Sequence, residues 1–230
     1  MIGFYDYTVV LTFVSLMSTV IGMTQAMDGR FRIALICLAI SGLCDTFDGK
    51  IARSKKNRTD DQKLYGIQLD SLCDVVCFGV FPAMICYLMG MNGVLSIAVL
   101  CYFVLCGVIR LAYFNVLETN RQTGDSDSEK VYHGLPITSI SVILPLVFVL
   151  GIFVTDQVFL YMLFAAMLIV GTLYIVDFRL KKPKDWMIYT LIGIVACAVI
   201  AVALFSSHQT IHRERQSPPL IDRITESCDE

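Results

Sequence analysis

The stretch from Phe31 to Gly49 reads FRIALICLAISGLCDTFDG, an apolar run that ends on two acidic residues, Asp45 and Asp48. A second stretch, residues 66–90, begins with two more aspartates and then becomes almost wholly apolar. A charged side chain inside a membrane helix costs about 2.5–3.5 kcal/mol on insertion scales. Acids at the ends of apolar runs therefore indicate a function, and these two stretches decide both the expected fold and the expected site.

Composition indicates a membrane protein. Of the 230 residues, 56% are hydrophobic and only 17% are charged, whereas a soluble domain has about 45–50% and about 25%. The formal net charge of −2 gives no basic surface for nucleic acid. A helix crosses a bilayer with about 20 apolar residues, and seven runs qualify: 8–27, 31–49, 67–90, 93–115, 135–154, 157–178 and 187–207.

We therefore expect an all-α, polytopic membrane helix bundle with a six-helix core and a seventh transmembrane helix. The expected membrane domain covers residues 1–186, and the additional helix covers 187–207. Residues 208–230 are polar and include Ser217-Pro218-Pro219, which is typical of a disordered tail.

Basic residues predict the orientation. The 50–65 connection holds six lysines and arginines, and such loops stay in the cytoplasm. This places the N-terminus inside and, with seven spans, the C-terminus outside. The acids at the end of the second run then face the cytoplasm.

The four acids have helical spacing. Asp45 and Asp48 are three residues apart, and Asp70 and Asp74 are four apart, so each pair lies on one face of its helix. The short connection makes the two helices antiparallel neighbours, which brings the carboxylates together. Oxygen-rich acidic sites suit hard cations such as Mg²⁺ or Mn²⁺.

Small residues and an arginine adjoin the acids. Gly49, Ala52 and Gly66 leave room for a bulky ligand near the backbone, and Arg53 offers a planar fork for phosphate. Carboxylates with metal, small residues and arginine together predict a diphosphate site at the membrane surface.

These residues carry a resemblance. The pattern Asp45-x-x-Asp48-Gly49-x-x-Ala52-Arg53, followed by Gly66-x-x-x-Asp70-x-x-x-Asp74, resembles the signature of the CDP-alcohol phosphatidyltransferase family. The stretch from Ser54 to Tyr65 has twelve residues, four more than the family commonly has. Segments 69–83, 110–116, 134–136 and 182–184 are similar to the bacterial phosphatidylserine synthase branch of that family.

The resemblance implies an enzyme that transfers the phosphatidyl group from CDP-diacylglycerol to the hydroxyl of L-serine, giving phosphatidylserine and CMP. It implies a protein of the bacterial cytoplasmic membrane, surrounded by membrane lipids and often a homodimer. It also implies two divalent ions, Mg²⁺ or Mn²⁺, and three sets of residues. The metal ligands would be Asp45, Asp48, Asp70 and Asp74; the general base would be Asp74; the nucleotide site would contain Asp48, Gly49, Ala52, Arg53 and Gly66.

Arg110 has two interpretations. It either snorkels to the membrane surface or faces the bundle and holds the serine carboxylate or a lipid phosphate. The acceptor also stays open, because the motif does not separate serine from the glycerol phosphate or inositol phosphate used by sister transferases. A carboxylate-based ion transporter is the alternative from another class, although such sites tend to lie near the bilayer midplane, often between internal repeats.

Overall fold

The computed structural model describes residues 9–54, 59–122, 132–177 and 179–180, which are almost entirely helical. In chain order the elements are α1 (Val10–Met27), α2 (Phe31–Ser54), α3 (Asp60–Asp74), the π-helix η2 (Val75–Val80), α4 (Phe81–Leu88), α5 (Val94–Gln122), β1 (Tyr132–His133), the 3-10 helix η3 (Ile137–Ser139), α6 (Ile140–Gly151), α7 (Asp156–Ile175) and β2 (Arg179–Leu180).

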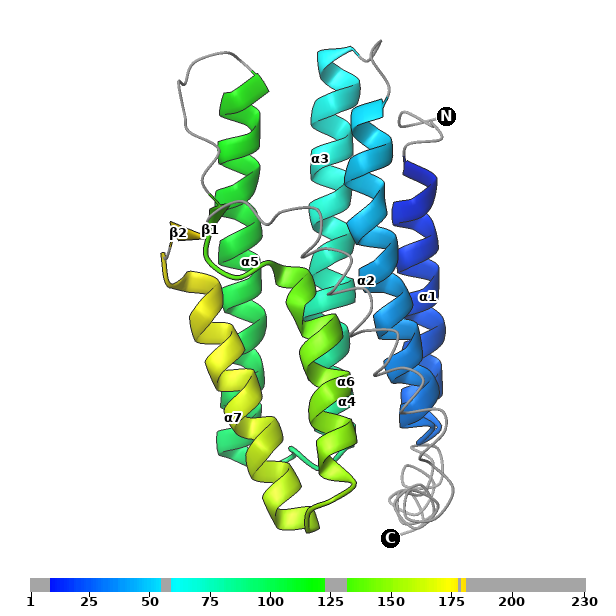
Figure 1. The fold of residues 1–230 in the computed structure, drawn as a ribbon, viewed down its shortest axis with the longest axis vertical. Helices are drawn as coiled ribbons and strands as arrows, with labels where there is room; N and C mark the ends of the chain where they lie inside the picture. Colours follow the sequence, from blue (N-terminus) through cyan, green and yellow to red (C-terminus); the bar gives the residue numbers. More distant parts are fainter. Residues whose placement is uncertain (1–8, 55–58, 123–131, 178, 181–230) are drawn as a thin grey trace, which may run out of the picture.

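The helices form one bundle along the long axis of the molecule (Figure 1). α1, α2 and α3 lie on one side, α5 and α7 on the other, and α4 and α6 between them. Among the described residues, four segments are long and apolar enough to cross a membrane: Val10–Met27, Asp60–Leu88, Val94–Thr119 and Asp156–Ile175. The predicted all-α membrane bundle is confirmed. The seventh run, 187–207, and the tail, 208–230, lie outside the described residues.

Large apolar side chains lie both in the core of the bundle and on its outer surface. Phe78, Phe81 and Phe103 are fully buried in the core between the helices. In contrast, Val94, Phe153 and Tyr161 are each more than 70% exposed. A soluble protein rarely exposes so much apolar surface, whereas the hydrocarbon of a bilayer covers it.

Several helices extend beyond the apolar runs that predicted them. α2 continues to Ser54 rather than ending at residue 49, α3 begins at Asp60 rather than 67, and α5 continues to Gln122 rather than 115. Hydropathy detects the part of a helix inside the membrane and not the polar turns that project from it. The predicted 50–65 loop is therefore helical at both ends.

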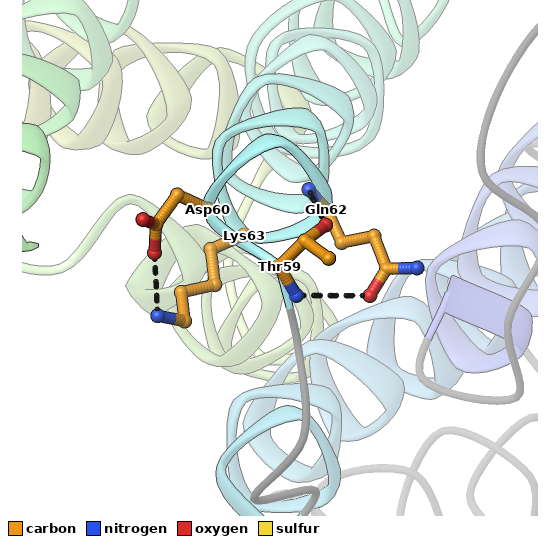
Figure 2. A network of polar contacts seen from close by, with 4 residues as sticks. All are labelled: Thr59, Asp60, Gln62 and Lys63. Carbon is orange, nitrogen blue, oxygen red and sulfur yellow. Dashed lines mark hydrogen bonds and ion pairs between the residues drawn. The ribbon is translucent and has the colours of Figure 1, made fainter.

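The start of α3 shows how a polar segment becomes helical. The Thr59 hydroxyl accepts a hydrogen bond from the Gln62 backbone N–H, and the Gln62 side chain accepts one from the Thr59 N–H (Figure 2). This reciprocal capping box satisfies two N–H groups that a helix end leaves unpaired. Lys63 also pairs with Asp60 at 2.8 Å.

The third long helix contains a π-helical turn directly after Asp74. Within it, the Phe81 N–H donates to the carbonyl of Val76, five residues back, and Pro82 follows in the first turn of α4. Proline has no N–H, and its ring clashes with the carbonyl four residues earlier in an α-helix. The wider π turn accommodates Pro82 while the helix continues through it, so α3, η2 and α4 act as one span.

Candidate active site

Three of the predicted acids meet. Carboxylate oxygens of Asp45, Asp70 and Asp74 all lie within 4.8 Å of one another. Asp45 comes from α2, and the other two come from the facing α3. Because the pair on α3 is four residues apart, both side chains are presented to the same neighbour. We call Asp45, Asp70 and Asp74 the acidic triad.

Asp48 adjoins this triad and also contacts α1. It is 7% exposed, and its carboxyl lies within hydrogen-bonding reach of that of Asp70. Its Oδ2 accepts a hydrogen bond of 3.3 Å from the Thr12 hydroxyl. The fourth predicted acid is therefore close to the other three, held between α1 and α3.

The electrostatics of the triad favour a cation. Two carboxylates at this separation repel each other by about 3 kcal/mol when the effective dielectric constant is about 20. Asp74 is only 8% exposed, so water screens its charge weakly. An all-oxygen donor set of this kind matches the ligand preference of hard divalent ions.

The packing of α2 against α6 fixes where the acids begin. A Cβ on Gly42 would lie 2.7 Å from the Cβ of Ser141, so only glycine permits this approach of the two helices. Asp45 comes three residues later, about 4.5 Å further along α2 at 1.5 Å per residue. The acids thus lie just beyond this close approach of α2 and α6.

The predicted nucleotide-binding residues flank the acids. Gly66 is half-buried on α3, one turn before Asp70. Gly49, Ala52 and Arg53 lie on the last turns of α2, but their side chains are outside the described part of the structure. The backbone thus places them on the same end of the bundle as the acids.

Arg110 is buried and does not snorkel. It is 8% exposed, its Nη1 donates to the carbonyl of Tyr174 at 3.4 Å, and its guanidinium carbon lies 4.6 Å from the centre of the Phe114 ring. Gly134, with φ +68°, makes room for it, since a Cβ there would lie 2.8 Å from Nη1. Arg110 therefore faces the bundle, at the point where the end of α7 meets the segment before α6.

Sequence reasoning missed three polar side chains close to the acids. Thr12 binds Asp48, as described, and Ser71 donates a 2.6 Å hydrogen bond to Asn115 on α5. Ser71 directly follows Asp70, so this bond ties α5 to α3 beside the triad. A hydroxyl or amide within a membrane helix was the available signal, but sequence alone does not say which way such a helix is rotated.

Comparisons with known proteins agree with the geometry. The family model described as CDP-alcohol phosphatidyltransferase matches residues 7–209. A CDP-diacylglycerol–serine O-phosphatidyltransferase of Saccharomyces cerevisiae is 38% identical over 51% of this chain and 46% of its own length. An archaetidylserine synthase of Methanothermobacter thermautotrophicus is 36% identical over 55% of this chain and 51% of its own.

A relative from Methanocaldococcus jannaschii, named CDP-diacylglycerol–serine O-phosphatidyltransferase, is 29% identical over 84% of this chain and 85% of its own. The first two matches cover only about half of those relatives. No solved structure matches the chain significantly. The family match spans most of the chain and includes every residue of the acidic site, so the chain belongs to the CDP-alcohol phosphatidyltransferase family.

Proposed function

We propose that this integral membrane protein transfers the phosphatidyl group from CDP-diacylglycerol to L-serine, giving phosphatidylserine and CMP. The observation that carries the proposal is the acidic triad. Its carboxylate oxygens lie within 4.8 Å of one another, and its residues lie in the part of the chain that matches a family of phosphatidyltransferases. The choice of serine is supported by the names of the relatives from yeast and from Methanocaldococcus jannaschii.

The donor set fits divalent metal, on which this family generally depends. Asp45, Asp70 and Asp74 would hold it, with Asp48 beside Asp70 as a further ligand, and we propose two Mg²⁺ or Mn²⁺ ions. Bound divalent cations would neutralise the charge that develops on the phosphoryl oxygens and on the departing phosphate. The protein's own contribution is to hold four carboxylates from two helices in a fixed arrangement.

Asp74 is the proposed general base. The reaction forms a bond between the serine hydroxyl oxygen and the phosphorus that carries diacylglycerol, and it breaks the bond from that phosphorus to the bridging oxygen, which leaves with CMP. Asp74 accepts the hydroxyl proton as the bond forms. Asp74 is buried and is the last residue of α3, one turn beyond Asp70. This position suits a group that acts at the reacting phosphorus rather than at the nucleotide.

The remaining site residues bind substrates in this proposal. The cytidine diphosphate contacts Asp48, Gly49, Ala52, Arg53 and Gly66, where small side chains allow close approach to the backbone. Arg110 holds the serine carboxylate or the lipid phosphate, because a guanidinium presents two parallel donors to a planar or tetrahedral anion.

We further propose that the protein lies in a bacterial cytoplasmic membrane with its site facing the cytoplasm, and that it forms a homodimer. Support for the orientation comes from the six basic residues between positions 50 and 65, since basic connections stay inside.

An acceptor panel tests the proposal. Purified protein is given CDP-diacylglycerol with Mg²⁺ or Mn²⁺, and separately L-serine, glycerol phosphate, inositol phosphate or inositol. We expect release of CMP with serine alone and loss of that activity in excess EDTA. Release with a phosphorylated acceptor instead would assign a sister transferase, and absence of any nucleotide-dependent thermal stabilisation would favour ion transport.

A further inference from the structure

A line of buried hydroxyls on α1 connects that helix to the acidic site. Thr12, Ser15 and Thr19 are all less than 7% exposed, and their spacing of three and four residues places them on one face. This face lies against α2, the partner with which α1 packs most extensively. None of these hydroxyls belongs to the proposed catalytic set.

The hydroxyls of Ser15, Thr19 and Ser41 fix how α1 and α2 are aligned. The hydroxyls of Thr19 and Ser41 are 2.9 Å apart, and the Ser41 hydroxyl also donates to the Ser15 carbonyl at 2.9 Å. Ser15 in turn donates to the Ser41 carbonyl at 3.3 Å. Several bonds on one short segment make sliding or rotation of the two helices costly, because each would leave buried polar groups unpaired.

The same alignment delivers Thr12 to Asp48. In an antiparallel pair, moving seven residues back along α1 corresponds to moving seven residues forward along α2, which is close to two full turns on each. The contact of Thr19 with Ser41 therefore implies a contact of Thr12 with residue 48, and the structure has this bond at 3.3 Å. Thr12 is 6% exposed and Asp48 is 7% exposed, so water competes little for either group.

We infer that Thr12 is a positioning residue for the metal site: its hydroxyl holds one oxygen of Asp48 and thereby fixes how that carboxylate is presented beside Asp70. This inference rests on the proposed metal-dependent function. Groups that hydrogen-bond to a ligating side chain typically change metal affinity by about 10–100-fold when they are removed. Thr12 donates its hydrogen bond to Asp48, so its effect should pass through Asp48.

The experiment measures Mn²⁺ binding directly, by electron paramagnetic resonance of free Mn²⁺ in a titration of detergent-solubilised protein without substrate. Thr12→Val keeps the shape and removes the hydroxyl, and we expect its Kd for Mn²⁺ to rise by about 10-fold or more. Thr12→Ser restores the hydroxyl and should stay within about threefold of the wild type. The Mn²⁺ concentration for half-maximal turnover should rise in parallel, with kcat recovering at saturating Mn²⁺.

Thr19→Val is the matched control, because it removes a buried hydroxyl from the same face of α1 about two turns from Thr12, while the two bonds between Ser15 and Ser41 keep α1 and α2 aligned. It should lower the Tm and leave the Kd for Mn²⁺ unchanged. Equal Kd values for Thr12→Val and wild type would overturn the inference while leaving the proposed function intact. Failure of the wild type to bind Mn²⁺ would overturn both. If Thr12→Val does not fold, Thr12→Ala replaces it, and a wild-type Kd in that variant refutes the positioning role equally.

Discussion

Removing one carboxylate from the acidic triad should stabilise the protein when metal is absent. Asp45→Asn replaces a charge by an amide of nearly the same shape. With oxygens within 4.8 Å, each ionised pair repels by about 3 kcal/mol at an effective dielectric constant of about 20. The variant loses two of the three pairs, so full ionisation would give a gain of about 6 kcal/mol.

Protonation limits this gain. A carboxyl group with an ordinary pKa of about 3.9 can take up a proton at pH 7 for about 4 kcal/mol, and the cluster would do so rather than store more repulsion. The expected stabilisation of Asp45→Asn in EDTA is therefore at most about 4 kcal/mol. For a chain of this length that corresponds to a rise in Tm of roughly 8–16 °C.

Bound metal should reverse the order of the two Tm values, so that the wild type becomes more stable than Asp45→Asn. A ligand present at 100 times its Kd adds about 2.7 kcal/mol to the stability of the protein that binds it, and the wild type should gain this from Mn²⁺ while Asp45→Asn gains far less. The assay is thermal unfolding in detergent with EDTA and with Mn²⁺. Asp61→Asn, which removes an exposed carboxylate from the first turn of α3, should change little in either condition. A lower Tm for Asp45→Asn in EDTA, or an equal Mn²⁺ gain in both proteins, would refute the reasoning.

Three further outcomes are expected. Asp74→Asn should abolish turnover and largely preserve CDP-diacylglycerol binding, because loss of a base affects the rate more than ground-state affinity; near-normal turnover would contradict the base assignment. Arg110→Lys should raise the KM for serine about 10–100-fold, the value of one charge-assisted hydrogen bond, with CDP-diacylglycerol affinity kept; weakened lipid binding with an unchanged KM would assign the residue to the phosphate. Gly42→Ala should cost about 1–3 kcal/mol of stability by overpacking against Ser141, whereas Gly79→Ala, whose Cβ meets its nearest neighbour at 3.9 Å, should be tolerated when the two Tm values are compared.

The bundle and the meeting of the acids could be predicted from the sequence because both follow from simple periodicities. Runs of about 20 apolar residues mark spans, and spacings of three and four place Asp45, Asp48, Asp70 and Asp74 on facing sides of neighbouring helices. The helix ends could not be predicted in this way. At Thr59 the helix starts through side-chain hydrogen bonds in a segment that hydropathy treats as loop.

The rotation of each helix about its axis is the other feature that could not be predicted from the sequence. Apolar residues flank Arg110 along its helix, so no polar face indicates which way its side chain points. The hydroxyls of Thr12, Ser15 and Thr19 share one face of α1, but their spacing does not say which helix that face meets. Only packing against other helices settles that Arg110 reaches the Tyr174 carbonyl and that Thr12 reaches Asp48. In a membrane the lipid and the protein interior are both apolar, which removes the pattern that makes such predictions work in soluble proteins.

The π-helical turn makes the count of residues between Asp74 and Pro82 a constraint in its own right. Each residue of an α-helix turns the chain by about 100°. An ordinary α-helix through the same residues would rotate everything before η2 by about that angle relative to α4. Because Phe78 and Phe81 anchor this helix in the core, the carboxylates of Asp70 and Asp74 would swing away from Asp45. Two chains with identical acids and an identical proline could thus differ entirely in activity through the conformation of one helical turn, with no charge, ligand or apolar run altered.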